Sequence, residues 1–303
     1  MDDSADASVP SRLPAWLRLV GPLLAMALLS RIDLGAVAAS LLEARWRPLV
    51  LSLLLAAPLF LAKAWRWRLL LRACGRPLPL AEAFWLYTIS SGAASLTPGA
   101  VGDFWKGLSP SVGRKSIGLW TSAIDRLYDL AMALLLALAV AVAWLHGGES
   151  RTIAALSLAA GLLALWALRQ RVLEAAAARL PRFPQAAGAL HDSVVAASAA
   201  TVVATLVALL RFQLLVVALA LPLDWSQSFV AFVLTSGVAA LPLSVAGVGT
   251  RDLALLGYLR GCGISTADSI ALSSLCLGLF VWNGIVAAAL WMLRPPLRHP
   301  TAP

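Results

Sequence analysis

Charged residues are scarce in this chain. Only 13% of its 303 residues are Asp, Glu, Lys or Arg, whereas 60% are hydrophobic. A soluble domain carries about a quarter charged residues, and no stretch here is both polar and long enough to form one. Apolar runs long enough to cross a bilayer, about 17–25 residues, recur throughout. The sequence therefore predicts an all-α polytopic membrane protein with a single transmembrane domain over residues 1–303 and no soluble domain.

Cysteine and histidine are also rare. The three cysteines, Cys74, Cys262 and Cys276, follow no CxxC or metal-binding spacing, so we expect them to be packing residues without a disulfide. The three histidines fall in predicted loops or in the C-terminal tail. A zinc or haem site needs clustered ligands inside the protein, so we expect neither a metal nor another cofactor.

The usual catalytic patterns are missing from the predicted spans. The chain has no GxxxxGK[ST] phosphate loop, so any driving force would be a gradient or the supply of substrate rather than ATP hydrolysis by this chain. No DxD motif, no catalytic histidine and no Ser/His pairing occurs within the spans. We therefore expect a protein that is not an enzyme.

Basic residues outnumber acidic ones, 24 to 15, which gives a formal charge of +9. In a membrane protein this excess sets orientation and meets anionic lipid headgroups, so we expect no nucleic-acid partner. In the run KAWRWRLLLR (63–72), Trp65 and Trp67 suit the headgroup level. We expect Lys63 and Arg66 to snorkel to the interface.

Hydropathy predicts six full spans, and the first is expected to be an uncleaved helix rather than a signal peptide. The spans are Trp16–Ser30, Pro48–Leu71, Ile117–Leu145, Thr152–Leu168, Ala199–Leu221 and Ala267–Leu293. The segment Ile32–Trp46 is predicted to be an amphipathic surface helix. A first half, about 48–145, is joined to a second half, about 199–293, through the span 152–168 and the basic loop 169–192.

Two weaker apolar stretches, Ala83–Leu96 and Phe229–Val245, resemble each other. SGAASLTPGAVGD (91–103) and SGVAALPLSVAGVG (236–249) share Ser-Gly, Ala and Leu in register, and each leads into a Gly-rich loop. Low-complexity composition can produce such a likeness by chance. Interrupted apolar segments at matching places in two halves, however, are a pointer to a transporter binding site.

Charge placement favours two re-entrant helical hairpins at these stretches. If both were full spans, the basic stretch 66–79 and the basic loop 169–191 would lie on opposite faces. As hairpins, they leave both basic stretches on the cytoplasmic face, as the positive-inside rule prefers. The hairpins would then enter from opposite faces as an inverted repeat. Arg31, Arg45 and Arg47 on the outer side count against this arrangement.

The candidate site residues lie in and beside the two breaks. Non-helical backbone at membrane depth is tolerated only where it is buried in protein or lines a wet cavity, and free N–H groups at helix ends bind anions. Ionisable groups at this depth are costly and tend to be functional. The predicted substrate-binding residues are Gly99, Gly102, Asp103, Lys106, Asp125, Arg126, Asp129, Arg211, Gly247, Gly249, Arg251 and Asp252.

A structural role is the alternative for these charges. The pairs at the hairpins would be local caps, and Asp125 and Asp129 would form salt bridges to a neighbouring span. Arg211 has no charged neighbour within a turn of its own predicted helix. It needs a partner from elsewhere: Asp125, Asp252 or a substrate phosphate. Asn283 is either an interhelical hydrogen-bonding residue or part of the site.

Three motifs carry a resemblance to a known family. PGAVGDFWK (98–106) is similar to a family motif Pro-Gly…Gly-Glu-x-x-Arg, IDRLYD (124–129) to Glu-Arg-x-x-Asp, and PLSVAGVGTRD (242–252) to Pro…Gly-x-Gly-x-Arg-Glu. Over nearly its whole length the chain resembles the transmembrane region of lysylphosphatidylglycerol synthases, a flippase-like integral membrane family. Asp replaces the usual Glu in each motif, and Lys106 replaces Arg, which loses bidentate geometry.

The resemblance implies the lipid-translocating half of such proteins, because we expect no soluble aminoacyl-transferring domain after Leu293. We therefore predict a multi-pass lipid translocator of the cytoplasmic (inner) membrane. Its expected partners are membrane lipids and, beyond them, lipid-biosynthesis enzymes. Two alternatives stay open: a membrane-embedded enzyme acting on a lipid-linked substrate, and a non-transporting subunit of a glycolipid or hopanoid assembly system. The lipid, the direction, the coupling ion and the oligomeric state are open as well.

Overall fold

A computed structural model describes residues 34–145, 184–240 and 249–293. Every regular element in these ranges is helical, so the all-α prediction is confirmed for them. The predicted spans 16–30 and 152–168, most of the basic loop 169–192 and Gly247 lie outside the described residues.

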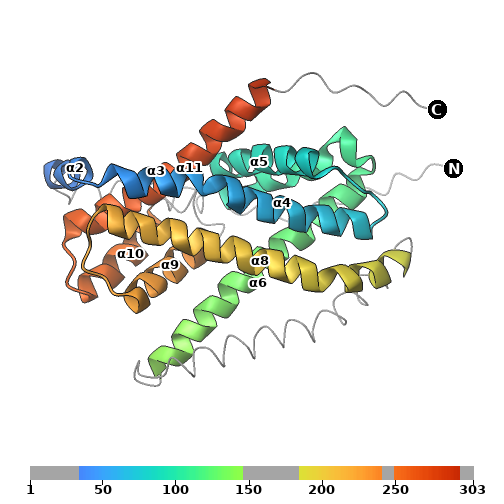
Figure 1. The fold of residues 1–303 in the computed structure, drawn as a ribbon. Coiled ribbons are helices and arrows are strands. Elements are labelled where there is room, and N and C mark those ends of the chain that lie inside the picture. Colours follow the sequence, from blue (N-terminus) through green and yellow to red (C-terminus); the bar gives the residue numbers. More distant parts are fainter. Residues whose placement is uncertain (1–33, 146–183, 241–248, 294–303) are drawn as a thin grey trace.

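The described elements form two groups in chain order (Figure 1). The first contains α2 (Leu34–Leu42), α3 (Trp46–Leu54), α4 (Ala56–Ala73), α5 (Leu80–Leu96), the 3₁₀ segments η1 (Pro98–Leu108) and η2 (Pro110–Val112), and α6 (Lys115–Leu145). The second contains α8 (Pro184–Ala218), α9 (Trp225–Ala240), α10 (Thr250–Gly261) and α11 (Thr266–Leu293).

Three helical stretches within the described ranges are long and apolar enough to cross a membrane. They are Trp46–Ala73, Ser193–Ala218 and Thr266–Leu293, with 28, 26 and 28 residues. About 20 apolar residues suffice for a span. Each stretch coincides with a predicted span, so a multi-pass membrane protein is the class that the helices define.

The predicted span Pro48–Leu71 is two helices that meet at Leu55. Pro58 has no N–H and its ring clashes with the carbonyl four residues earlier, and that residue, Leu54, is where α3 ends. Helices α3 and α4 follow one another along α8 (Figure 1). The last four carbonyls of a helix accept no hydrogen bond from the helix itself. The carbonyl of Ser52 can therefore accept a hydrogen bond from a residue outside α3.

The first weak stretch folds back on itself instead of continuing as a span. Segment η1 packs against α5, and Ser90 Oγ donates to the carbonyls of Gly102 at 3.0 Å and Asp103 at 2.6 Å. A Cβ at Gly102 would lie 2.4 Å from the carbonyl carbon of Ala93. Only glycine permits this approach, which is why the backbone of η1 can lie directly on α5.

The second weak stretch is also interrupted. Helix α9 ends at Ala240, and α10 begins at Thr250 and packs back against α9. Helix α10 was not predicted from the sequence. It has only 12 residues, and three of them, Arg251, Asp252 and Arg260, are charged, so it does not read as an apolar segment. The residues between the two helices, 241–248, lie outside the description.

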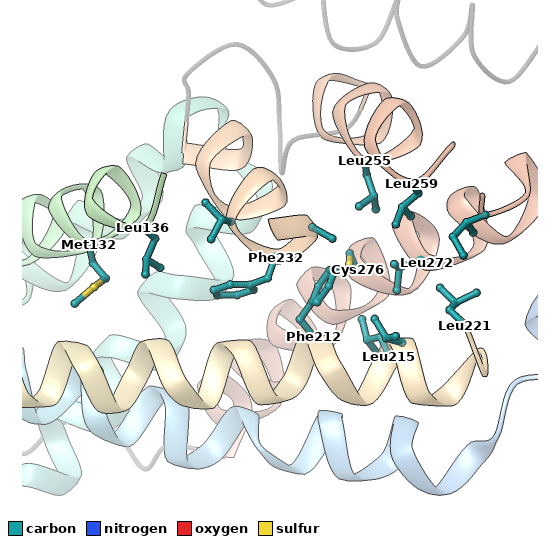
Figure 2. Packing of buried hydrophobic residues seen from close by; sticks show 14 residues of the cluster. Met132, Leu136, Phe212, Leu215, Leu221, Phe232, Leu255, Leu259, Leu272 and Cys276 are labelled. Atoms are coloured by element: carbon teal, nitrogen blue, oxygen red, sulfur yellow. The ribbon is translucent and has the colours of Figure 1, made fainter. Parts of the chain in front are cut away.

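A cluster of buried apolar side chains joins α8 to α9, α10 and α11. Figure 2 shows its labelled side chains filling the space between α8 and the other helices. The rings of Phe212 and Phe232 lie 6.0 Å apart, centroid to centroid. Cys276, 7% exposed, packs in this cluster, and all three cysteines are free. The packing role predicted for Cys276 is therefore confirmed.

Trp67 does not lie at the surface. It is fully buried and packs with Phe60, Leu71 and Leu86, whereas Trp65 is 41% exposed. Residues two apart on a helix point in different directions, so the two tryptophans cannot share one environment. Trp67 therefore packs inside the protein and not on its outer surface, and the headgroup depth of both rings stays a prediction.

Candidate functional site

A cavity of about 360 Å³ lies between helices of both halves. Its volume falls in the range of small-molecule sites, about 300–1,000 Å³. Five predicted site residues line it: Asp103, Arg126, Asp129, Arg211 and Arg251. They come from η1, α6, α8 and α10. The chain thus brings its separate charged motifs to one place.

Asp125 of α6 is the centre of a buried ion network beside this cavity. It accepts from Arg66 Nε at 2.6 Å, from Lys106 Nζ at 3.0 Å and from Tyr87 Oη at 3.1 Å. The side chains of Asp125, Arg66 and Lys106 have no exposed surface. Because the three partners come from α4, α5 and η1, one carboxylate fastens α6 to these three elements.

Two further carboxylates complete the network. Asp129 accepts from Arg66 Nη1 at 2.8 Å and from Lys63 Nζ at 2.7 Å. Asp103 accepts from Lys106 Nζ at 2.9 Å. Three cations thus balance three carboxylates. Asp125 and Asp129 form salt bridges to a neighbouring helix, which is the structural alternative expected from the sequence.

The position of Arg66 contradicts the prediction made for it from the sequence. It does not snorkel to the interface but is fully buried between Asp125 and Asp129. Lys63 reaches the same network and keeps only 25% of its side chain exposed. A signal was available: Lys63 and Arg66 share one face of α4, as Asp125 and Asp129 share one face of α6. Hydropathy gives depth in the membrane but not the face that a side chain occupies.

Aromatic rings complete the surroundings of Lys106. Its Nζ lies 4.1 Å from the ring centroid of Tyr87 and 5.9 Å from that of Trp67. Cation–π attraction is strongest where the cation is removed from water. This contact gives a reason for the burial of Trp67, and Tyr87 is a site residue that the sequence did not predict.

The charged pair of the second half caps α10. Arg251 Nη2 donates to Asp252 Oδ1 at 3.0 Å and to the carbonyl of Ser273 at 3.1 Å. Asp252 Oδ2 accepts from the N–H of Gly249 at 2.9 Å, and Ser273 Oγ donates to Asp252 Oδ1. An acidic side chain that bonds back to the N-cap amide closes a helix start. Arg251 is 2% exposed.

The backbone amides of Gly102 and Gly249 already donate to acceptors within the protein. The N–H of Gly102 donates to Thr97 Oγ1 at 2.8 Å, and that of Gly249 donates to Asp252. The expectation of open amide donors for an anion therefore does not hold for Gly102 and Gly249 in this structure. Gly99 lies in the first turn of η1.

Arg211 of α8 has neither of the carboxylate partners expected for it. Its Nε donates to the carbonyl of Ser52 at 2.9 Å, and its Nη2 lies 3.5 Å from Asn283 Oδ1. Ser52 Oγ donates in return to the carbonyl of Arg211 at 3.1 Å. No carboxylate of a described residue forms an ion pair with Arg211. Asp125 and Asp252, the predicted partners, are bound elsewhere.

Arg126 also faces the cavity without a partner among the described residues. It is half-buried on α6, next to Asp125 in sequence. It forms no ion pair with a residue whose side chain the structure describes, a set that does not include residues 184–192. Among the same described side chains, no group of three or more His, Cys, Asp or Glu is placed to hold a metal ion.

These features define a multi-pass helical membrane protein with a charged cavity between its two halves. The model of the family described as the lysylphosphatidylglycerol synthase TM region matches residues 16–294, and the chain belongs to this family. The resemblance carried by the three motifs is thereby confirmed. No curated protein matches the chain. The family ties the chain to lipid biosynthesis or lipid translocation in a membrane.

Proposed function

We propose that the chain is a lipid translocator of the cytoplasmic (inner) membrane. The headgroup enters the cavity while the acyl or isoprenoid tail stays in the bilayer, and the lipid leaves chemically unchanged. The observation that carries the proposal is a cavity lined by charged side chains from both halves of an otherwise apolar helical protein. Ionisable groups at such depth mark substrate pathways in membrane proteins.

Two re-entrant hairpins related by an inverted repeat are the proposed architecture. Exchanging the halves maps α4 onto α8, α5 onto α9, η1 onto α10 and α6 onto α11. The helix contacts follow this exchange: α5 packs on α11 as α9 packs on α6, and η1 packs on α6 as α10 packs on α11. Helices α4 and α8 pack on each other.

The directions of the helices support the same relation. In Figure 1, α4 and α8 run in opposite directions, and α6 and α11 end on opposite sides of the helix cluster. Equivalent helices of an inverted repeat are oriented in this way. In transporters built so, substrate sites lie at the repeat interface and access alternates by rocking of one half against the other.

The ion network has a part in this mechanism. Because Asp125 binds cations from α4 and from η1, it makes the first hairpin and its two bracketing helices one rigid body. Asp252 likewise fixes the start of α10, because it accepts hydrogen bonds from the N–H of Gly249 and from Ser273 Oγ of α11. Movement would then occur where the halves touch, along α4–α8, α5–α11 and α6–α9.

Reconstitution tests the proposal. Purified protein is placed in vesicles that carry a trace of tail-labelled phospholipid, and a membrane-impermeant reductant bleaches label in the outer leaflet. We expect bleaching beyond the outer-leaflet half, with the labelled lipid unchanged in mass. Bleaching that stops at the level of protein-free vesicles, for every lipid tried, would refute translocation. A lipid of altered mass would favour an enzyme instead.

A further inference from the structure

The charges that face the cavity do not cancel. Its lining contains four cationic side chains but two carboxylates, Asp103 and Asp129. Both carboxylates are already bound: Asp103 to Lys106, and Asp129 to Lys63 and Arg66. Apart from Lys63, the lining cations are Arg126, Arg211 and Arg251.

Only one of these three arginines has a carboxylate among the described residues. Arg251 is paired with Asp252. Arg126 and Arg211, on α6 and α8, have none among the side chains that the structure describes. A buried charge needs a counter-charge or several hydrogen bonds. The cavity is therefore short of negative charge at two guanidinium groups that come from opposite halves.

From this deficit we infer that the transported headgroup is anionic, with a phosphate that Arg126 and Arg211 bind from opposite halves of the protein. The inference rests on the proposed function and narrows it to one substrate class. A guanidinium presents a planar fork of donors that matches phosphate oxygens. A cationic headgroup would find no carboxylate in the described lining that is free of a bound cation.

Ser52 holds Arg211 in a position that suits this role. The carbonyl of Ser52 takes the Nε donor at 2.9 Å. The Nη2 contact with Asn283, at 3.5 Å, is at the outer limit for a hydrogen bond. Nη1 has no hydrogen bond with a described residue. The two terminal nitrogens of Arg211, which form the phosphate-binding edge of a guanidinium, thus keep donors for a ligand.

The test compares three tail-labelled lipids in the vesicle assay: anionic phosphatidylglycerol, zwitterionic phosphatidylcholine and cationic lysyl-phosphatidylglycerol. We expect phosphatidylglycerol to move fastest. Arg126→Gln and Arg211→Gln should each slow it roughly tenfold, the effect of losing one charge-assisted hydrogen bond, and Arg211→Lys should recover part of the rate. Arg260→Gln, at an exposed position of α10, is the matched control and should leave it unchanged.

Binding of inorganic phosphate gives a second readout that does not depend on transport. Phosphate should raise the unfolding temperature of the detergent-solubilised protein, and the R126Q/R211Q double variant should lose this shift. Loss of phosphatidylglycerol transport together with the shift, in variants that still unfold cooperatively, supports a lipid phosphate at this site.

The failures of the two proposals differ. If no lipid of any charge moves but phosphate still binds through the two arginines, translocation is wrong and the anion site stands as a site for free phosphate. If lipids move at rates independent of charge, and the arginine variants behave like Arg260→Gln in both assays, translocation stands and the inference is overturned.

Discussion

Arg66 on α4 and Asp125 on α6 lie 2.6 Å apart, Nε to Oδ1, and neither side chain reaches the surface. Asp125 also accepts from Lys106 of η1. One carboxylate therefore holds together three separate elements, α4, η1 and α6. A buried ion pair is weak evidence for stability by itself, but removal of one partner leaves an uncompensated charge. The position of Asp125 makes that consequence testable.

Asp125→Ala should lower the free energy of unfolding by about 3–5 kcal/mol, because Arg66 and Lys106 each lose a carboxylate at a site without water access. Thermal or denaturant unfolding in detergent measures the change. Asp129→Ala is the matched comparison, since its carboxylate is 20% exposed, and we expect a smaller loss. An Asp125→Ala protein as stable as the parent would show that the network does not hold α4, η1 and α6 together.

Close backbone packing between η1 and α6 gives a second prediction. A Cβ at Gly118 would lie 1.9 Å from the carbonyl oxygen of Gly107, so Gly118→Ala forces the two segments apart and should cost about 1–3 kcal/mol. Gly278→Ala on α11 is the control, because nothing lies within 4 Å of its Cβ position. It should be neutral or stabilising by up to about 1 kcal/mol. Equal stability of the two variants would contradict this packing.

Two fully buried serines are expected to respond differently to the same change. Ser52 Oγ donates to the carbonyl of Arg211 at 3.1 Å, so Ser52→Ala should cost about 1 kcal/mol and slow transport by loosening Arg211. Ser228 Oγ is buried without a partner among the described residues, so Ser228→Ala should be neutral or slightly stabilising. The free energy of unfolding and the rate of lipid transport in vesicles are measured for both variants. A larger loss of stability in Ser228→Ala than in Ser52→Ala would contradict this difference in hydrogen bonding.

The cap of α10 can be tested by hydrogen exchange. Asp252→Ala removes the acceptor for the Gly249 amide and for Arg251, so amides at the start of α10 should exchange faster, by the roughly 1 kcal/mol that a cap contributes. Asp268→Ala, at the start of α11 beside Ser265, should speed exchange there and leave α10 unchanged. Unaltered exchange over Thr250–Asp252 in the Asp252→Ala protein would rule out the cap.

Much of the fold follows from apolar periodicity and length. The predicted spans Ile117–Leu145 and Ala267–Leu293 begin within two residues of α6 and α11 and end with them. The division of Pro48–Leu71 at Leu55 was not predicted, although Pro58 gives its local cause. A hydropathy average is taken over a whole segment, so it does not detect that one residue, the proline, lacks a backbone N–H donor.

The candidate site could be predicted in its members but not in its pairings. Asp103, Arg126 and Arg211 were expected at a cavity and line it. Which acid meets which base depends on how α4, α6 and η1 pack, and no local pattern contains that information. For this reason Arg66 was wrongly assigned to the interface, and of the three partners left open for Arg211 the two carboxylates, Asp125 and Asp252, are excluded.

The most direct test of the account is whether the cavity itself is the route of the headgroup. In a background whose three native cysteines are replaced by alanine, Thr205→Cys places a thiol at the cavity lining of α8, and Val203→Cys places one on the exposed outer face of the same helix. Reaction with a bulky thiol reagent should abolish lipid movement in the first protein and spare it in the second. Undiminished movement with Thr205→Cys fully modified would contradict a pathway through the cavity.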